Sequence, residues 1–300
     1  MSSRNCLCPY VICKVWGNCE ACIAKNIAEG TMANCMEKIS VEQFGAKMPY
    51  KRVPTEVPGD FEAMSKRSAE LLAAHVRKKP DALLCLAAGN TAIRTYEILK
   101  EMSSHGELDF SESRFVALDE WVGLENPEGN CASFMKKYFY GPLGIDYSRV
   151  VAFDPEASDL EAECLRVDAW LATNGPIDLF LLGMGMNGHL GLNEPGVHWN
   201  RHSIVVDLDP LTAQVGQKYF KQETKLTRGI TLGMKYILEA KSVILQVGEA
   251  KKAEIVRKLF DSDIEFAMPA TIVRLHPDAL LILDEDAASL LSTEEEKDKS

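Results

Sequence analysis

The hydrophobic positions between residues 60 and 284 fall into two alternating patterns. Continuous apolar runs of strand length predict strands at 82–86, 114–118, 178–182, 242–247 and 279–283. Apolar residues at helical spacing predict a helix after Asp60, which can act as its N-cap. The same spacing predicts further helices in the stretches near Thr91, Ser158 and Ala250. Because strands alternate with helices, the sequence predicts an α/β fold, a Rossmann-like parallel sheet with helices on both faces.

A glycine-rich loop follows the predicted strand at 178–182. Residues 183–195 read GMGMNGHLGLNEP and combine four glycines with one histidine and one carboxylate. The glycines allow a ligand to approach the backbone closely, and Glu194 can serve as a negatively charged partner for the titrating ring of His189. The loop therefore predicts a site that transfers protons.

The first three glycines of this loop also have the G-x-G-x-x-G spacing of dinucleotide-binding turns. That fingerprint requires a helix to begin near the third glycine, Gly188, and to hold a pyrophosphate at its N-terminus. Gly191 and Pro195 interrupt any helix here. The spacing alone does not indicate a nucleotide cofactor.

Three further polar turns follow predicted strands. Gly89, Asn90 and Thr91 form a small-residue turn before a helix, where backbone N–H groups can face an anion, although ordinary strand-to-helix turns look the same. Asp119 and Glu120 follow 114–118, and a turn ending at Lys251 follows 242–247. Ligands of parallel sheets bind outside the carboxyl ends of the strands, so the turn at Asp119 and Glu120, the loop that begins at Gly183 and the turn ending at Lys251 are expected to meet at one crevice.

Composition and charge narrow the partners of the chain. Its 300 residues are 46% hydrophobic and carry a formal net charge of -11, which argues against the nucleic-acid backbone as a partner. The apolar runs are too short to cross a membrane, and the N-terminus lacks the pattern of a secretory signal. We expect a cytoplasmic protein with no nucleic-acid or membrane partner.

Cysteines are concentrated at the start of the chain. Residues 1–47 are predicted to form a cysteine-rich N-terminal segment, 48–291 the main domain and 292–300 a charged tail. The segment contains Cys6, Cys8, Cys13, Cys19, Cys22 and Cys35. Cys19 and Cys22 have a spacing that suits zinc or iron in a reducing compartment, while a redox-responsive segment with free thiols is the alternative.

Four separated motifs resemble one family of sugar-phosphate enzymes. They are LAAGNT from Leu86, LDEWVG from Leu118, GMGMNGHLGLNEPG from Gly183 and LTRGITLGMKYIL from Leu226. In order and spacing they resemble the glucosamine-6-phosphate deaminase and galactosamine-6-phosphate isomerase family over about residues 55–284, most closely its galactosamine branch. The resemblance implies that the substrate is an amino-sugar phosphate and that the chemistry needs no organic cofactor. It also favours a homo-oligomer.

The same resemblance implies roles for individual residues in isomerisation and deamination of a hexosamine 6-phosphate. Asp119 would be the base that moves a proton from carbon 2 to carbon 1, with Glu120 orienting this base or the substrate. His189, held by Glu194, would open the sugar ring. Ammonia and a ketose phosphate would be released. The expected substrate-binding residues are Gly89, Asn90, Thr91, Glu120, Gly188 and Lys251.

Two positions depart from the family pattern. Asn187 stands where the deaminases usually carry an aspartate, and it orients by hydrogen bonding without supplying negative charge. We count Asn187 with the catalytic residues, and we expect Glu194 to supply the missing charge. Ala213 stands where the deaminases present an arginine to the substrate phosphate, so phosphate binding is expected to depend on the 89–91 turn, Lys251 and Arg228.

Two other functions remain open at this point. The 6-phosphogluconolactonases resemble this chain in architecture and in their glycine-histidine loop, but they hydrolyse an ester. A sugar-phosphate sensor would bind the same ligands without turnover. The gluco and galacto epimers differ only in the orientation of the hydroxyl at carbon 4, which the sequence does not distinguish.

Overall fold

The computed structural model describes residues 53–291, and its centre is a seven-stranded sheet in which every pair of strands is parallel. The strand order is β1-β10-β9-β6-β2-β3-β5. The strands are β1 (Thr55–Glu56), β2 (Leu83–Leu86), β3 (Arg114–Val116), β5 (Val150–Val151), β6 (Leu179–Leu182), β9 (Ser242–Val247) and β10 (Ala279–Leu283). The predicted α/β fold and its predicted strands are confirmed, and the two-residue edge strands β1 and β5 are added.

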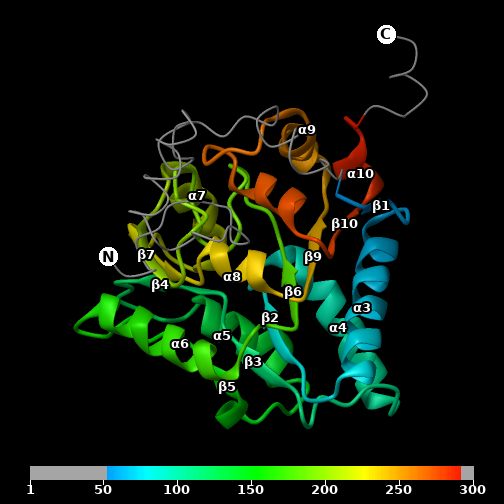
Figure 1. Ribbon diagram of the computed structural model, residues 1–300, viewed down its shortest axis with the longest axis horizontal. Coiled ribbons are helices and arrows are strands. Elements are labelled where there is room, and N and C mark those ends of the chain that lie inside the picture. The colour runs from blue at the N-terminus through cyan, green and yellow to red at the C-terminus, as the bar shows by residue number, and fades with distance from the viewer. Residues whose placement is uncertain (1–52, 292–300) are drawn as a thin grey trace, which may run out of the picture.

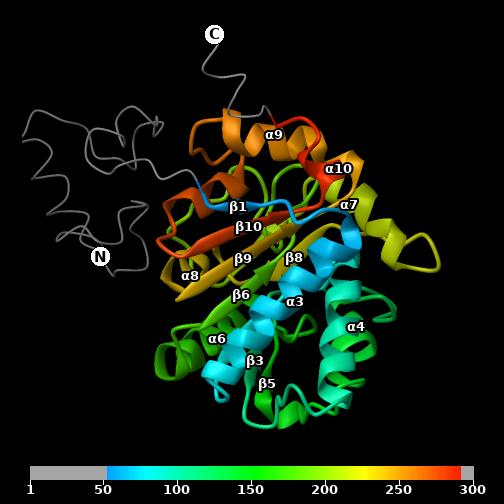
Figure 2. The same ribbon diagram turned by 90° about the vertical axis from the view of Figure 1, so that its right-hand side faces the viewer.

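Helices cover both faces of this sheet, as Figures 1 and 2 show. On one face α3 (Phe61–Lys78) and α4 (Asn90–Ser104) pack against Leu84 and alternate strand residues. On the other face Cys85 and the residues of neighbouring strands that point the same way pack against α6 (Leu160–Asn174), α8 (Met234–Glu239) and α9 (Ala253–Asp261). Successive strand residues point to opposite faces, so burial of both faces explains why these strands read as continuous apolar runs.

The predicted helix boundaries agree with local capping. Asp60 caps α3 because its carboxylate accepts a hydrogen bond from the Ala63 N–H at 2.9 Å. The helix predicted from Ala250 is divided, since a 3₁₀ turn at Ala250–Lys252 precedes α9. Glu249 starts this turn with φ of 79°, in the left-handed region that residues with a side chain seldom adopt. The turn therefore lies at a specialised backbone position.

A second sheet, which the periodicity did not predict, carries one side of the site. It is antiparallel in the order β4 (Asp119–Val122), β8 (Arg228–Thr231) and β7 (Ile204–Asp207). The run predicted at 114–118 contains β3, which ends at Val116, and a second strand, β4, begins directly after the run at Asp119. Asp119 is the first residue of a strand in another sheet, and not part of a turn after β3.

Short helical segments connect these elements. They are α5 (Cys131–Met135), a π-helix at Lys136–Tyr140, a 3₁₀ turn at Tyr147–Arg149, α7 (Pro210–Gly216) with a 3₁₀ turn at Gln217–Tyr219, a 3₁₀ helix at Pro269–Leu275 and α10 (Glu285–Ala288). Within residues 53–291 no helix is both long and apolar enough to cross a membrane. The cysteine-rich segment, its metal prediction and the charged tail lie outside the described residues.

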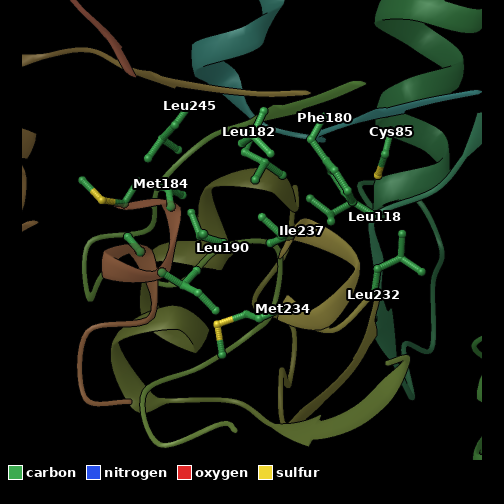
Figure 3. Packing of buried hydrophobic residues seen from close by; sticks show 14 of the residues in the cluster. Cys85, Leu118, Phe180, Leu182, Met184, Leu190, Leu232, Met234, Ile237 and Leu245 are labelled. Carbon is green, nitrogen blue, oxygen red and sulfur yellow. The ribbon is translucent and has the colours of Figure 1, made fainter. Parts of the chain in front are cut away.

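The glycine-rich loop is supported from below by the core. Figure 3 shows Leu182 and Leu245 of the parallel sheet, Met184 and Leu190 of the loop, and Ile237 of α8 gathered in one cluster. These side chains are at most 5% exposed. The loop therefore has a buried apolar base beneath its polar residues.

Candidate active site

A cavity of about 420 Å³ opens at the carboxyl ends of β2, β6 and β9. Its wall includes the 89–91 turn, Asp119, the loop that begins at Gly183, one side of α7 and the turn after β9. Asp119, the loop that begins at Gly183 and the turn ending at Lys251, which were predicted to meet at one crevice, all contribute to this wall, whereas Glu120 does not. This volume suits a small metabolite and not a macromolecule.

Asp119 lies in the cavity wall at the start of β4. It is 9% exposed and its backbone pairs with Thr231 of β8, which fixes the position of the side chain. Burial raises the pKa of Asp119 to about 7, with a further contribution from the neighbouring Glu120 carboxylate and an opposing one from a hydrogen bond with the Cys131 thiol. Near neutral pH this carboxylate can both accept and release a proton.

Glu120 has a different environment. One of its carboxylate oxygens accepts hydrogen bonds from the N–H groups of Trp121 at 2.8 Å and Cys131 at 2.9 Å, and the other accepts one from Ala132 at 2.8 Å. Burial raises the pKa of Glu120 in spite of these donors. The side chain is 3% exposed and is not part of the cavity wall. Its position suits the predicted orienting role, because it ties β4 to the start of α5, but not direct contact with a substrate.

Cys131, which the sequence reasoning missed, connects these two carboxylates. It is the first residue of α5, and it lines the cavity beside Asp119. Asn130 caps the helix by accepting a hydrogen bond from the Ser133 N–H at 2.8 Å. Asn130 is recognisable in the sequence as a helix cap, because small residues follow it. Nothing in the sequence, however, places Cys131 beside Asp119.

His189 and Glu194 come together as predicted, and Asn187 and Thr212 complete the cluster. His189 Nδ1 lies 3.4 Å from Glu194 Oε2 and 3.0 Å from Thr212 Oγ1. Asn187 Nδ2 donates to Glu194 Oε2 at 2.8 Å, and the Thr212 hydroxyl donates to the same oxygen at 3.0 Å. Burial raises the pKa of Glu194, but hydrogen bonds from His189, Thr212 and Asn187 outweigh it, so the pKa is lowered overall.

Two glycines of the loop are required by close packing. A Cβ on Gly185 would collide with the His189 ring, so a side chain here would displace the imidazole. A Cβ on Gly188 would collide with Met268, and Gly188 also has φ of +83°. Gly188 was predicted to bind substrate, but it is not part of the cavity wall, and its position indicates a packing role instead.

The opposite side of the cavity is cationic. Lys218, Lys251 and Lys252 line it near the first turn of α4, where Gly89 provides no side-chain cap and leaves backbone N–H groups for an anion. Lys252 donates a hydrogen bond to the carbonyl of Met184, and burial, followed by the charge of Lys218, lowers the pKa of Lys252 to about 8. Burial also lowers the pKa of Lys218.

Only part of this cationic group was predicted. Lys251, the lysine named from sequence, forms an ion pair with Glu249 at 2.9 Å and has a side chain that is 54% exposed. Lys252 and Lys218 were missed, and Arg228 is exposed at the start of β8, outside the cavity wall. Ala213 packs against the apolar cluster around Trp121. Lys218, five residues further along, brings a cation from the same segment into the cavity.

The fold and the site together define an α/β protein with a cavity at the carboxyl edge of its parallel sheet, whose wall combines lysines, a carboxylate of raised pKa and a histidine. The profile of the glucosamine-6-phosphate isomerases/6-phosphogluconolactonase family matches residues 61–282. The chain belongs to this family.

Relatives and solved structures agree with the match. The chain is 36% identical over 233 residues to a glucosamine-6-phosphate deaminase of Bacillus pumilus, covering 77% of this chain and 97% of the relative. It is 37% identical over 235 residues to one from Halothermothrix orenii, covering 77% and 97%. A monomeric glucosamine-6-phosphate deaminase superposes with a TM-score of 0.76 at 34% identity, covering 79% of this chain and 99% of that structure.

A more distant structure shares only the fold. The 6-phosphogluconolactonase from Leishmania guyanensis superposes with a TM-score of 0.64 at 19% identity, covering 81% of this chain and all of the other.

Proposed function

We propose that the protein isomerises and deaminates a hexosamine 6-phosphate, releasing ammonia and a ketose 6-phosphate. The observation that carries this proposal is Asp119, a buried carboxylate in the cavity wall whose pKa is raised to about 7. An aldose-to-ketose conversion needs one base that removes a proton from carbon 2 and returns it to carbon 1, and a pKa near the working pH suits both steps.

The substrate phosphate binds at the cationic side of the cavity. Lys252, which is partly buried, and Lys218, which is exposed, supply positive charge at the cavity wall, and the backbone at Gly89, Asn90 and Thr91 supplies N–H donors at the first turn of α4. Lys251 adds a more exposed charge that Glu249 partly neutralises. With the phosphate held there, the sugar carbons extend across the cavity toward Asp119 and His189.

His189 opens the ring of the bound sugar. The imidazole lines the cavity and is supported from behind by Thr212, Glu194 and Asn187. A proton leaves the anomeric hydroxyl as the bond between carbon 1 and the ring oxygen breaks, and the ring oxygen receives a proton. An open-chain amino aldehyde results.

Asp119 then carries out the isomerisation. Its carboxylate takes the proton from carbon 2, giving an enolamine between carbons 1 and 2, and delivers a proton to carbon 1. The product is a ketimine at carbon 2. Water adds to this carbon, the nitrogen leaves as ammonia, and the ketose phosphate remains.

The choice of epimer has support on both sides. The relatives named above are glucosamine-6-phosphate deaminases, which favours glucosamine 6-phosphate and its product fructose 6-phosphate. Asn187 and Ala213 are the departures that resemble the galactosamine branch, which would give tagatose 6-phosphate. We propose glucosamine 6-phosphate as the first substrate to assay and galactosamine 6-phosphate as the second.

Ammonia release by the full chain with each hexosamine 6-phosphate tests this function and the epimer together. We expect turnover with at least one epimer and none with 6-phosphogluconolactone. Absence of ammonia from both, with folded protein, would contradict the proposal. Lactone hydrolysis would then support the hydrolase, and tight sugar-phosphate binding without any product would support the sensor.

A further inference from the structure

Thr212 occupies the centre of the cluster behind His189. It lies in α7, is 5% exposed and reaches three polar groups with one hydroxyl. Its Oγ1 is 3.0 Å from Glu194 Oε2, 3.0 Å from His189 Nδ1 and 3.2 Å from Asn187 Nδ2. A hydroxyl has one donor and two acceptor positions, so these three contacts use its full capacity.

The direction of each hydrogen bond can be deduced from its partners. The backbone N–H of His189 meets the Asn187 side chain at 3.2 Å, and an N–H can only donate, so the amide atom there is the oxygen. The amide nitrogen therefore faces Glu194 and Thr212, and it donates to both. The lowered pKa of Glu194 keeps its carboxylate ionised, so it accepts only, and the Thr212 hydrogen must point toward it.

One acceptor position of Thr212 then remains, and it faces His189. Since the hydroxyl hydrogen goes to Glu194 and Asn187 is a donor, the contact with His189 Nδ1 requires that this nitrogen carries a hydrogen. The neutral ring is therefore protonated at Nδ1 and has its free lone pair at Nε2. Gly185, which lacks a side chain, lies against the Nε2 edge of the ring and also lines the cavity.

We propose that Thr212 is a positioning residue that fixes the Nδ1-protonated tautomer of His189, so that Nε2 is the nitrogen that exchanges protons with the sugar. This inference rests on the proposed role of His189 in ring opening. Nε2 takes the proton of the anomeric hydroxyl while the aldehyde forms, and the imidazolium then gives a proton to the ring oxygen. Thr212 links the charged ring to Glu194 by two contacts of 3.0 Å, shorter than the direct 3.4 Å contact.

The tautomer is measurable by NMR of ¹⁵N-histidine-labelled full chain, in which the protonated and unprotonated ring nitrogens have distinct shifts. A His189→Gln spectrum identifies the His189 signals. We expect Nδ1 protonated and Nε2 unprotonated in the wild type and in Thr212→Ser. In Thr212→Val the two shifts should move toward each other, because the second tautomer becomes populated. A wild-type ring protonated at Nε2, or Thr212→Val signals identical to wild type, would overturn the inference.

Kinetics provide the second readout. Thr212→Val should lower kcat roughly tenfold, a fraction of the roughly 10²- to 10⁴-fold contribution of a general acid–base group. Thr212→Ser should restore most of it. The Kd of an unreactive open-chain hexosaminitol 6-phosphate should stay unchanged in both variants. Equal loss in the serine and valine variants would show that the hydroxyl is not responsible.

A matched control separates local from general effects. Thr173 is an exposed threonine of α6 that is not part of the cavity wall, and Thr173→Val should leave both the spectrum and kcat unchanged. The NMR result does not depend on turnover. If ammonia release fails in the wild type, the proposed function falls, while the tautomer assignment is still decided by the spectrum.

Discussion

Asp119 and Glu194 are two buried carboxylates of one site whose surroundings shift their pKa values in opposite directions. Asp119 is desolvated next to the Glu120 carboxylate, and its pKa is raised to about 7. Glu194 is also buried, but three donors converge on its Oε2, and its pKa is lowered. Burial raises the pKa of both residues, so their neighbours account for the difference: the Glu120 carboxylate raises the pKa of Asp119 further, whereas hydrogen bonds and the electrostatic attraction of His189 lower the pKa of Glu194.

This difference assigns two kinds of work to the two carboxylates. A group that titrates near neutral pH can take up and release a proton during a reaction, as the proposed base must. A group kept ionised serves better as a fixed negative charge that orients a histidine and stabilises its protonated form. Pairs of carboxylates separated in this way are typical of acid–base sites in enzymes.

Removing the proton carrier should have the largest effect. Asp119→Asn keeps the size of the side chain but leaves no basic oxygen, so we expect kcat to fall by roughly 10³-fold, within the range for loss of a general base. Ammonia release measures the loss. The Kd of hexosaminitol 6-phosphate, measured by calorimetry, should change less than about threefold, because the phosphate and hydroxyl contacts remain.

Near-normal turnover in Asp119→Asn would show that Asp119 is not the base, and the difference in role between Asp119 and Glu194 would no longer hold.

Glu120→Gln is the control variant at the neighbouring carboxylate. Both Glu120 oxygens accept backbone hydrogen bonds, so this change should lower the midpoint of thermal unfolding together with activity. Asp119→Asn should leave that midpoint unchanged or raise it, since a buried charge is removed.

Removing the fixed charge should have the second largest effect. Glu194→Gln retains the shape but places a neutral amide opposite the Asn187 and Thr212 donors, and we expect kcat to fall by roughly 10²-fold. Because Glu194 does not line the cavity, the KM should change little. A large rise in KM with unchanged kcat would show that Glu194 acts in binding and would contradict its assignment as an orienting charge.

The fold was predictable because its main signal is local. Strands buried on both faces read as continuous apolar runs, and Asp60 is recognisable in the sequence as the N-cap of the first helix. The antiparallel sheet was not predicted because β4 begins with Asp119 and Glu120 only two residues after β3 ends, and two adjacent carboxylates are typical of a turn and not of a strand. Pairing of β4 with β8 is set by tertiary contacts more than a hundred residues apart in sequence.

The site was predictable where residues cluster in sequence and not where the fold assembles them. Asn187, His189 and Glu194 occupy one loop, and their contact follows from its motif. Thr212 reaches the same cluster from α7, and Cys131 reaches Asp119 from α5, which no spacing along the chain reveals. Which of Lys251 and Lys252 faces the cavity depends on where the helix begins, because each residue turns the direction of the side chain by about 100°. The sequence does not define that starting residue.

The two adjacent lysines offer a test of which one binds the phosphate. Lys252→Met should raise the KM by about 10- to 100-fold, the range for a lost charge-assisted hydrogen bond, with a smaller effect on kcat. Lys251→Met should raise it only a few-fold, because that ammonium is half exposed and paired with Glu249. Steady-state kinetics of both variants make the comparison, and equal effects would contradict the preference for Lys252.

The pH dependence of KM sharpens the same test. The pKa of Lys252 is lowered to about 8, so in the free enzyme its positive charge is lost as the pH rises through this value. We expect the KM to increase above about pH 8 in the wild type and in Lys251→Met. Lys252→Met should show a weaker dependence, because the titrating group is gone.

The smallest expected effect concerns the Cys131 thiol beside Asp119. The proposed base must be ionised, so kcat/KM should fall as the pH drops through an apparent pKa of about 7. A hydrogen bond from Cys131 lowers the pKa of Asp119, and its removal in Cys131→Ala should therefore raise it. The acidic limb of the pH profile should move to higher pH by less than about one unit, since a thiol is a weak donor.

Two further variants decide whether that shift comes from the hydrogen bond. Cys131→Ser supplies a stronger donor, so its acidic limb should stay at the wild-type pH or move below it. Cys164→Ala removes a buried thiol of α6 that is not part of the cavity wall, and it should leave the profile unchanged. A shift to lower pH in Cys131→Ala would mean that the thiol disfavours the charged carboxylate. Desolvation and Glu120 alone would then separate the pKa of Asp119 from that of Glu194.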